Sequence, residues 1–201
     1  MRVLGIDPGL ATMGWGVVDA GARNPVFISC GIISTPPGMR LQERLTSIKR
    51  SVNELLAEYK PDEIVFEELF FSRNVTTALT VGAARGVAIT ACAEYTPMLY
   101  EYTPMQIKQG ITGYGKADKK QVQQMVALIL RLSDIPKPDD AADAVAAAIT
   151  PARPMTPCAR PATPGRRATG GSRRAPRAAG RSGTKSRCPR GGSRPIPDGR
   201  T

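Results

Sequence analysis

Six carboxylates at three separate places in the chain are the residues best suited to chemistry. Each place is the end of a predicted strand or the start of a predicted helix. They are Asp7, Glu67, Glu68, Asp139, Asp140 and Asp143. Carboxylate oxygens are the ligands that Mg²⁺ prefers. Two Mg²⁺ ions held by shared carboxylates are a recurring apparatus for phosphodiester hydrolysis, so the joint pattern favours a metal-dependent hydrolase.

Each of these carboxylates also has an ordinary structural explanation. Asp7 precedes Pro8-Gly9, so its side chain can cap the turn of a hairpin. A pair of aspartates at the start of a helix complements the helix dipole without any metal. A metal site is therefore predicted only if the fold brings the three places together.

Spacing alone leaves two choices among the six carboxylates open. Residues three and four apart share a helix face, so either Asp139 or Asp140 can point the same way as Asp143. Glu67 and Glu68 both stand at the end of the same predicted strand. The residue pattern does not decide between the members of either pair.

The elements that must position these carboxylates form an α/β set. Hydrophobic patterning predicts five strands, over residues 2–6, 14–19, 26–35, 63–67 and 98–102. It predicts four helices, over residues 39–59, 75–94, 117–132 and 139–150. The short turns between the first three strands imply antiparallel pairing, and helical crossovers add the other two strands. The expected fold is a five-stranded mixed sheet flanked by helices.

Charge is distributed very unevenly along the 201 residues. The whole chain has a net charge of +11. Residues 151–201 contain 13 Lys and Arg but a single acidic residue, a net charge of +12, which leaves −1 for residues 1–150. The same segment has 9 Pro, 8 Gly and no aromatic residue, a composition that cannot build a core. We predict a folded domain over 1–150 and a disordered basic tail over 151–201.

The tail has two competing explanations. A chain with this many cations can be an arm that binds DNA without sequence preference. Alternatively, it is a frameshift product, since Arg, Pro, Gly and Ala all have GC-rich codons. The abrupt change of composition at Pro151, inside a predicted helix, favours the frameshift.

Several function classes are excluded by composition. The chain has no His, and its four Cys are far apart, which excludes the usual zinc patterns and His-based catalytic triads. No signal-peptide pattern and no apolar run near 18 residues is present. A reducing, cytoplasmic location is therefore predicted.

Six motifs resemble one known family. They are LGIDPG at 4–9, GWGVVD at 14–19, FEELFF at 66–71, ALTVGAARGVA at 78–88, EYTPMQIKQGITGYGKADKKQVQQMV at 101–126, and PDDAADAVAAAI at 138–149. In order and spacing they resemble the RuvC-type Holliday-junction resolvases of the ribonuclease-H-like superfamily. The resemblance spans about residues 1–150, nearly all of the predicted domain.

The resemblance implies a reaction, a cofactor and partners. The family's four acidic residues, which are both catalytic and metal-binding, map onto Asp7, Glu67, Asp140 and Asp143. The implied activity is paired, Mg²⁺-dependent cutting of four-way DNA junctions in recombination and repair, with two Mg²⁺ per site and Mn²⁺ as a substitute. The implied partners are junction DNA, a second copy of the chain, and the branch-migration complex of RuvA and RuvB. The helix at 75–94, which has few charges and contains Leu79, Val87 and Ile89, is the expected dimer interface.

The resemblance also implies contacts to DNA, and each of the residues concerned has a simpler structural explanation as well. Phe70 matches an aromatic that intrudes near the junction centre, although core packing also explains a Phe there. Lys108 and Lys119 match phosphate-facing residues, although any exposed Lys is a solvated side chain by default. The loop ending at Lys116, ahead of Lys119-Lys120, can offer backbone N–H groups to phosphate. Arg73 and Arg85 are weaker candidates of the same kind.

Three other functions compete with this one, and the first of them is set aside by chain length. Sugar-kinase and actin-like ATPases share the opening G-I-D-x-G turn, but they need a second lobe that about 150 residues cannot supply. A ribonuclease-H-like nuclease that acts on RNA precursors is harder to exclude. A non-catalytic DNA-binding protein would leave the carboxylate set unexplained.

Overall fold

The structure is a computed structural model, and it describes residues 1–21, 24–68 and 75–150. Phe70, Arg73 and the predicted tail at 151–201 lie outside these ranges. Five strands form one sheet in the order β3-β2-β1-β4-β5. Their bounds are β1 Arg2–Asp7, β2 Thr12–Asp19, β3 Val26–Ser34, β4 Glu63–Glu67 and β5 Leu99–Tyr102. The β1–β2 and β2–β3 pairs are antiparallel, while β1–β4 and β4–β5 are parallel, which confirms the predicted mixed sheet.

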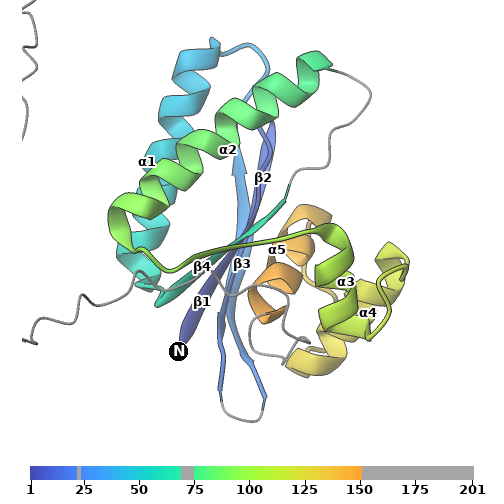
Figure 1. The fold of residues 1–201 in the computed structure, drawn as a ribbon. Coiled ribbons are helices and arrows are strands. Elements are labelled where there is room, and N and C mark those ends of the chain that lie inside the picture. The colour runs from blue at the N-terminus through green and yellow to red at the C-terminus, as the bar shows by residue number, and fades with distance from the viewer. Residues whose placement is uncertain (22–23, 69–74, 151–201) are drawn as a thin grey trace, which may run out of the picture. The chain divides into compact units, whose positions relative to one another are not determined.

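Helices cover both faces of this sheet (Figure 1). Their bounds are α1 Leu41–Tyr59, α2 Val75–Tyr95, α3 Pro104–Thr112, α4 Lys119–Leu130 and α5 Asp139–Ile149. One core cluster joins α1 and α2 to the face that carries Leu4 and Ile6. A second cluster joins α3, α4 and α5 to the opposite face, which carries Val3 and Val65. The four predicted helices are present, with ends that differ by at most two residues.

Helix α3 was not predicted from the sequence. Its hydrophobic pattern is short, with Ile107 and Ile111 as its buried residues. Its start nevertheless carries a local signal, because the Thr103 hydroxyl accepts from the backbone N–H of Gln106 at 3.1 Å and the Gln106 side chain accepts from the backbone N–H of Thr103 at 2.8 Å. Pro104 occupies the first turn, where its missing N–H costs nothing. This capping box is the signal from which the helix could have been found.

Glycines let α5 approach the sheet at backbone distance. A Cβ atom on Gly5 would overlap the carbonyl oxygen of Ala144 and lie 2.7 Å from the backbone nitrogen of Ala148. A Cβ atom on Gly16 would lie 2.8 Å from the backbone nitrogen of Val145. The alanines of α5 are buried against β1 and β2, so small residues on both sides fix the helix on the sheet.

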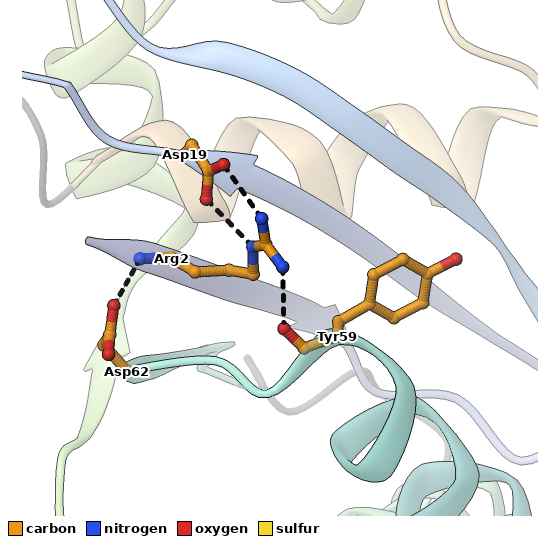
Figure 2. Close-up of polar contacts among 4 residues, drawn as sticks. All are labelled: Arg2, Asp19, Tyr59 and Asp62. Atoms are coloured by element: carbon orange, nitrogen blue, oxygen red, sulfur yellow. Dashed lines mark hydrogen bonds and ion pairs between the residues drawn. The ribbon is translucent and has the colours of Figure 1, made fainter.

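A polar network fastens the far end of β1, away from the candidate site (Figure 2). The Arg2 guanidinium donates to both carboxylate oxygens of Asp19, at 2.9 and 3.0 Å, and to the carbonyl oxygen of Tyr59 at 3.1 Å. The backbone N–H of Arg2 donates to Asp62 at 2.6 Å. The network ties the start of β1 to the end of β2 and to the segment after α1.

Among the described residues, no helix combines the length and apolar character of a membrane span.

Candidate active site

Two of the predicted carboxylates come from neighbouring parallel strands. Asp7 ends β1 and Glu67 ends β4, each directly after the paired residues Ile6 and Phe66. Side chains alternate between the two faces of a strand. Ile6 and Phe66 belong to the core on the α1–α2 side, so Asp7 and Glu67 point to the other face, where α5 lies.

Helix α5 brings two further carboxylates to this edge of the sheet. One carboxylate oxygen from each of Asp7, Asp140 and Asp143 lies within 4.8 Å of the other two. Gly14 sets this closeness, because a Cβ atom there would overlap the carbonyl oxygen of Asp140. Sequence reasoning missed the role of the glycines, although glycines at alternate positions of a strand, ahead of an Ala-rich helix, are a readable sign of close packing.

Glu67 lies outside that group of three carboxylates, but its pKa is affected by two of them. Burial, followed by the charges of Asp7 and Asp143, raises the pKa of Glu67 to about 8. Burial, followed by the charges of Asp143 and Asp140, raises the pKa of Asp7 to about 6. Burial also raises the pKa of Asp143, against the opposing effect of its hydrogen bond from Lys119. The pKa values of Asp7, Glu67 and Asp143 are therefore raised together at one place, by burial first and by neighbouring acids second.

This cluster fits a divalent metal ion. Its donors are all carboxylate oxygens, the type that hard cations prefer. Burial, followed by the charges of neighbouring acids, raises the pKa values of Asp7 and Glu67, and a bound cation would offset both effects by favouring the ionised carboxylates. The residues that would hold the ion are Asp7, Glu67, Asp140 and Asp143.

The structure separates Glu67 from Glu68. Glu67 is half-buried and coupled to the cluster, whereas Glu68 is exposed. The backbone N–H of Glu68 donates to the carbonyl oxygen of Tyr102 at 2.8 Å, which continues the β4–β5 pairing. Of the two residues at this strand end, Glu67 is the one that faces the other acids.

Asp139 and Asp140 also take different positions. Asp140 belongs to the three-carboxylate group together with Asp143, which follows it by three residues on α5. Asp139 has a side chain that is 69% exposed, and it contacts α4 through Lys119 at 3.4 Å and Gln123 at 3.2 Å. The two neighbours on α5 therefore have different partners, and Asp140 is the one that lies with Asp7 and Asp143.

Two of the predicted basic residues reach the cluster. The Lys119 ammonium lies 2.9 Å from a carboxylate oxygen of Asp143. The charge of Lys108, on α3, lowers the pKa of Glu67 against the larger effect of burial. Lys116 and Lys120 are exposed, and Arg85 lies 2.7 Å from Glu101, an ion pair between α2 and β5.

Comparison with known protein families identifies the family to which this chain belongs. A family model described as "Crossover junction endodeoxyribonuclease RuvC" matches residues 3–151. The chain belongs to the RuvC family. It is accordingly a crossover junction endodeoxyribonuclease, a hydrolase of a family that uses divalent metal ions.

RuvC relatives match the chain over most of their own length. The RuvC of Alkaliphilus oremlandii is 50% identical over 149 residues, which cover 74% of this chain and 91% of that protein. The structure of Thermus thermophilus RuvC has a TM-score of 0.69 at 38% identity and covers 75% of this chain and 92% of that one. The T. thermophilus RuvC in complex with a Holliday junction substrate has a TM-score of 0.68 at 36% identity, covering 75% and 91%. The predicted ribonuclease-H-like fold is confirmed by these RuvC neighbours.

Proposed function

We propose that this RuvC family member cuts four-way DNA junctions with two Mg²⁺ ions held by Asp7, Glu67, Asp140 and Asp143. The observation that carries the proposal is the close approach of three carboxylates. One oxygen from each of Asp7, Asp140 and Asp143 lies within 4.8 Å of the other two, although β1 and α5 are far apart in the sequence. When bound, the metal supplies an activated water and stabilises the leaving oxygen of the phosphodiester. The T. thermophilus relative whose structure contains a Holliday junction supports junction DNA as the substrate.

Residues at the site have further roles in binding the cation and the phosphate. The Glu67 carboxyl, with its pKa near 8, holds a proton near neutral pH in the metal-free protein and gives it up when a cation binds. Lys108 and Lys119 add positive charge next to the acids, where a phosphate would otherwise be repelled. Lys116, Lys120 and Phe70 remain proposed contacts to DNA, and Phe70 lies outside the described residues.

Paired cutting requires two sites, so we place a homodimer interface on α2. Leu79 is 70% exposed on this helix, so its apolar side chain is available to a second copy of the chain. Val87 and Ile89 are partly buried and pack on the core below, so they contribute less free surface than the sequence indicated. An open groove of about 610 Å³ along α1, lined by Leu45, Ala57 and Val87 among others, extends the same surface. A two-fold dimer presents such a patch twice and places two active sites on one junction.

Family membership also supports a proposal about the location, the cellular process and the partner proteins of the enzyme. We infer that it acts in the cytoplasm, in recombination and repair, together with the branch-migration complex of RuvA and RuvB. The folded nuclease domain of this proposal spans residues 1–150, and residues 151–201 form the basic tail.

A substrate panel tests the proposed function directly. Labelled four-way junction, plain duplex and structured RNA are incubated with the protein, with and without Mg²⁺. We expect symmetric incisions in the junction alone, and only with Mg²⁺. Cutting of duplex as fast as junction would overturn the junction assignment, and faster cutting of RNA would favour a nuclease of RNA precursors.

A further inference from the structure

Helices α4 and α5 face each other through two pairs of side chains beside the carboxylate cluster. Lys119 and Gln123 are four residues apart on α4, and Asp139 and Asp143 are four apart on α5, so each pair shares a helix face. Lys119 spans both aspartates, at 2.9 Å from Asp143 and 3.4 Å from Asp139. Gln123 donates to Asp139 at 3.2 Å.

The two oxygens of Asp139 have different partners. Gln123 contacts Oδ1, while Lys119 faces Oδ2. The amide of Gln123 therefore fixes the carboxylate so that its second oxygen is presented to the ammonium group. Asp139 does not belong to the group of carboxylates around Asp7, and its side chain is 69% exposed, against 28% for Asp143.

Metal binding would force Lys119 to change partners. Asp143 is one of the proposed metal ligands, and a divalent cation there repels a neighbouring ammonium group. The Lys119 side chain is 48% exposed and flexible, so without a second partner it would turn into solvent. Asp139 supplies that second partner within the same contact.

We propose that Asp139 is a positioning residue that retains Lys119 at the edge of the carboxylate cluster when a metal ion occupies Asp143. The inference rests on the proposed function, since it takes Asp143 as a metal ligand. Lys119 then stays where a phosphate bound at the metal would meet it. Gln123 acts one step further out, by holding Asp139.

A double-mutant cycle read by calorimetry tests this role without any cleavage. Mg²⁺ is titrated into the full chain carrying Asp139→Asn, Lys119→Met or both changes. With Lys119 present, loss of Asp139 leaves Asp143 as the only carboxylate that holds the ammonium, so a bound cation must displace Lys119 into solvent, and we expect Mg²⁺ affinity to fall about three-fold or more. With Lys119→Met in place, Asp139→Asn should change the affinity by less than about two-fold.

Equal losses in both backgrounds would overturn the proposal, because Asp139 would then act only through its own charge. Glu68→Gln is the matched control, since it removes an exposed carboxylate next to Glu67 that does not contact Lys119 in the described structure. Its effect should be the same with and without Lys119. Asp139→Glu, which keeps the charge, should recover most of the affinity.

Single-turnover cutting of the junction at saturating Mg²⁺ provides a second readout. Asp139→Asn should slow the cutting step several-fold in the presence of Lys119 and leave it unchanged in the Lys119→Met background. Asp7→Asn in the same calorimetric series tests the metal site itself. If Asp7→Asn leaves Mg²⁺ binding intact, the proposed function fails, whatever the cycle shows for Asp139.

Discussion

Gly14 of β2 lies directly beneath Asp140 of α5, so closely that a Cβ atom on the glycine would overlap the aspartate's carbonyl oxygen. Gly14 is also the register partner of Asp7 in the β1–β2 ladder. One residue without a side chain thus touches two segments that carry the candidate metal ligands. The spacing between Asp7 and Asp140 depends on this contact.

Gly14→Ala should therefore damage both stability and cutting. The added methyl group must push the first turn of α5 away from β2, which costs about 1–3 kcal/mol of unfolding free energy, as overpacking typically does. Mg²⁺ affinity should fall with it, because Asp140 moves relative to Asp7. Urea unfolding and junction cutting measure the two effects. Gly38→Ala is the control, since no atom lies within 4 Å of a Cβ there; equal behaviour of the two variants would refute the positioning role of Gly14.

The metal-free protein should lose stability as pH rises. Burial and neighbouring acids raise the pKa of Asp7 to about 6 and that of Glu67 to about 8, above the ordinary values of 3.8 and 4.5. The fold favours the protonated forms, so their contribution is complete below about pH 4 and is lost as pH rises toward about 8. Urea unfolding in a chelator across this range measures the decline.

Two controls accompany the pH series. Glu67→Gln should remove the decline in the upper part of the range, since the amide cannot ionise. Saturating Mg²⁺ should reverse the trend, because a bound cation favours the ionised carboxylates. Stability of the metal-free protein that rises between pH 6 and pH 8 would contradict the clustering of Glu67 with Asp7.

Leu79→Glu should yield monomers. Leu79 is 70% exposed, so a charge there harms the monomer little but would be buried without a partner in a dimer formed through α2. Light scattering reports the mass, and cutting of the junction should lose its paired character. Leu128→Glu is the matched control, because Leu128 is 71% exposed on α4. A Leu79→Glu protein that stays dimeric places the interface elsewhere.

Truncation after Thr150 should keep the fold and the junction preference. Thr150 is buried, and its hydroxyl donates to the carbonyl oxygen of Ala146 at 2.9 Å, so the described packing of α5 is complete at this point. Removal of 13 cations should weaken duplex binding and flatten its salt dependence by about 0.9 in log–log slope for each lost phosphate contact. Failure of the truncated chain to fold would show that the tail is structural.

The origin of the tail can be read from the gene. A frameshift predicts that an alternative frame near codon 150 continues the Ala-rich helix and then stops. Stop codons in both alternative frames would favour a native DNA-binding arm instead.

The candidate site was largely predictable because its residues stand at element boundaries. Apolar runs that end on Asp7 and Glu67 mark strand ends, and parallel neighbours bring such ends to one edge. The choice of Glu67 over Glu68, by contrast, depends on which face of β4 points to α5. Spacing does not contain that information; the family resemblance implied the choice, and the structure places Glu67 beside the other acids.

Contacts between helices were beyond the reach of sequence patterns. The contact of Lys119 with Asp143 joins residues 24 positions apart, and it depends on how α4 packs against α5. Spacing marks Asp139 only as an alternative to Asp140, because its contact with Gln123 depends on the same packing. Helix α3 was missed because its apolar pattern is short, although its capping box at Thr103 was readable.

The most direct test of the metal-site assignment compares two adjacent glutamates. Single-turnover cutting of a labelled four-way junction is measured in Mg²⁺ for the wild-type protein, Glu67→Gln and Glu68→Gln, with junction binding measured in parallel. We predict that Glu67→Gln binds the junction but loses cutting by several orders of magnitude, because a metal ligand is lost, whereas Glu68→Gln cuts at close to the wild-type rate. Near-normal cutting by Glu67→Gln would contradict the account.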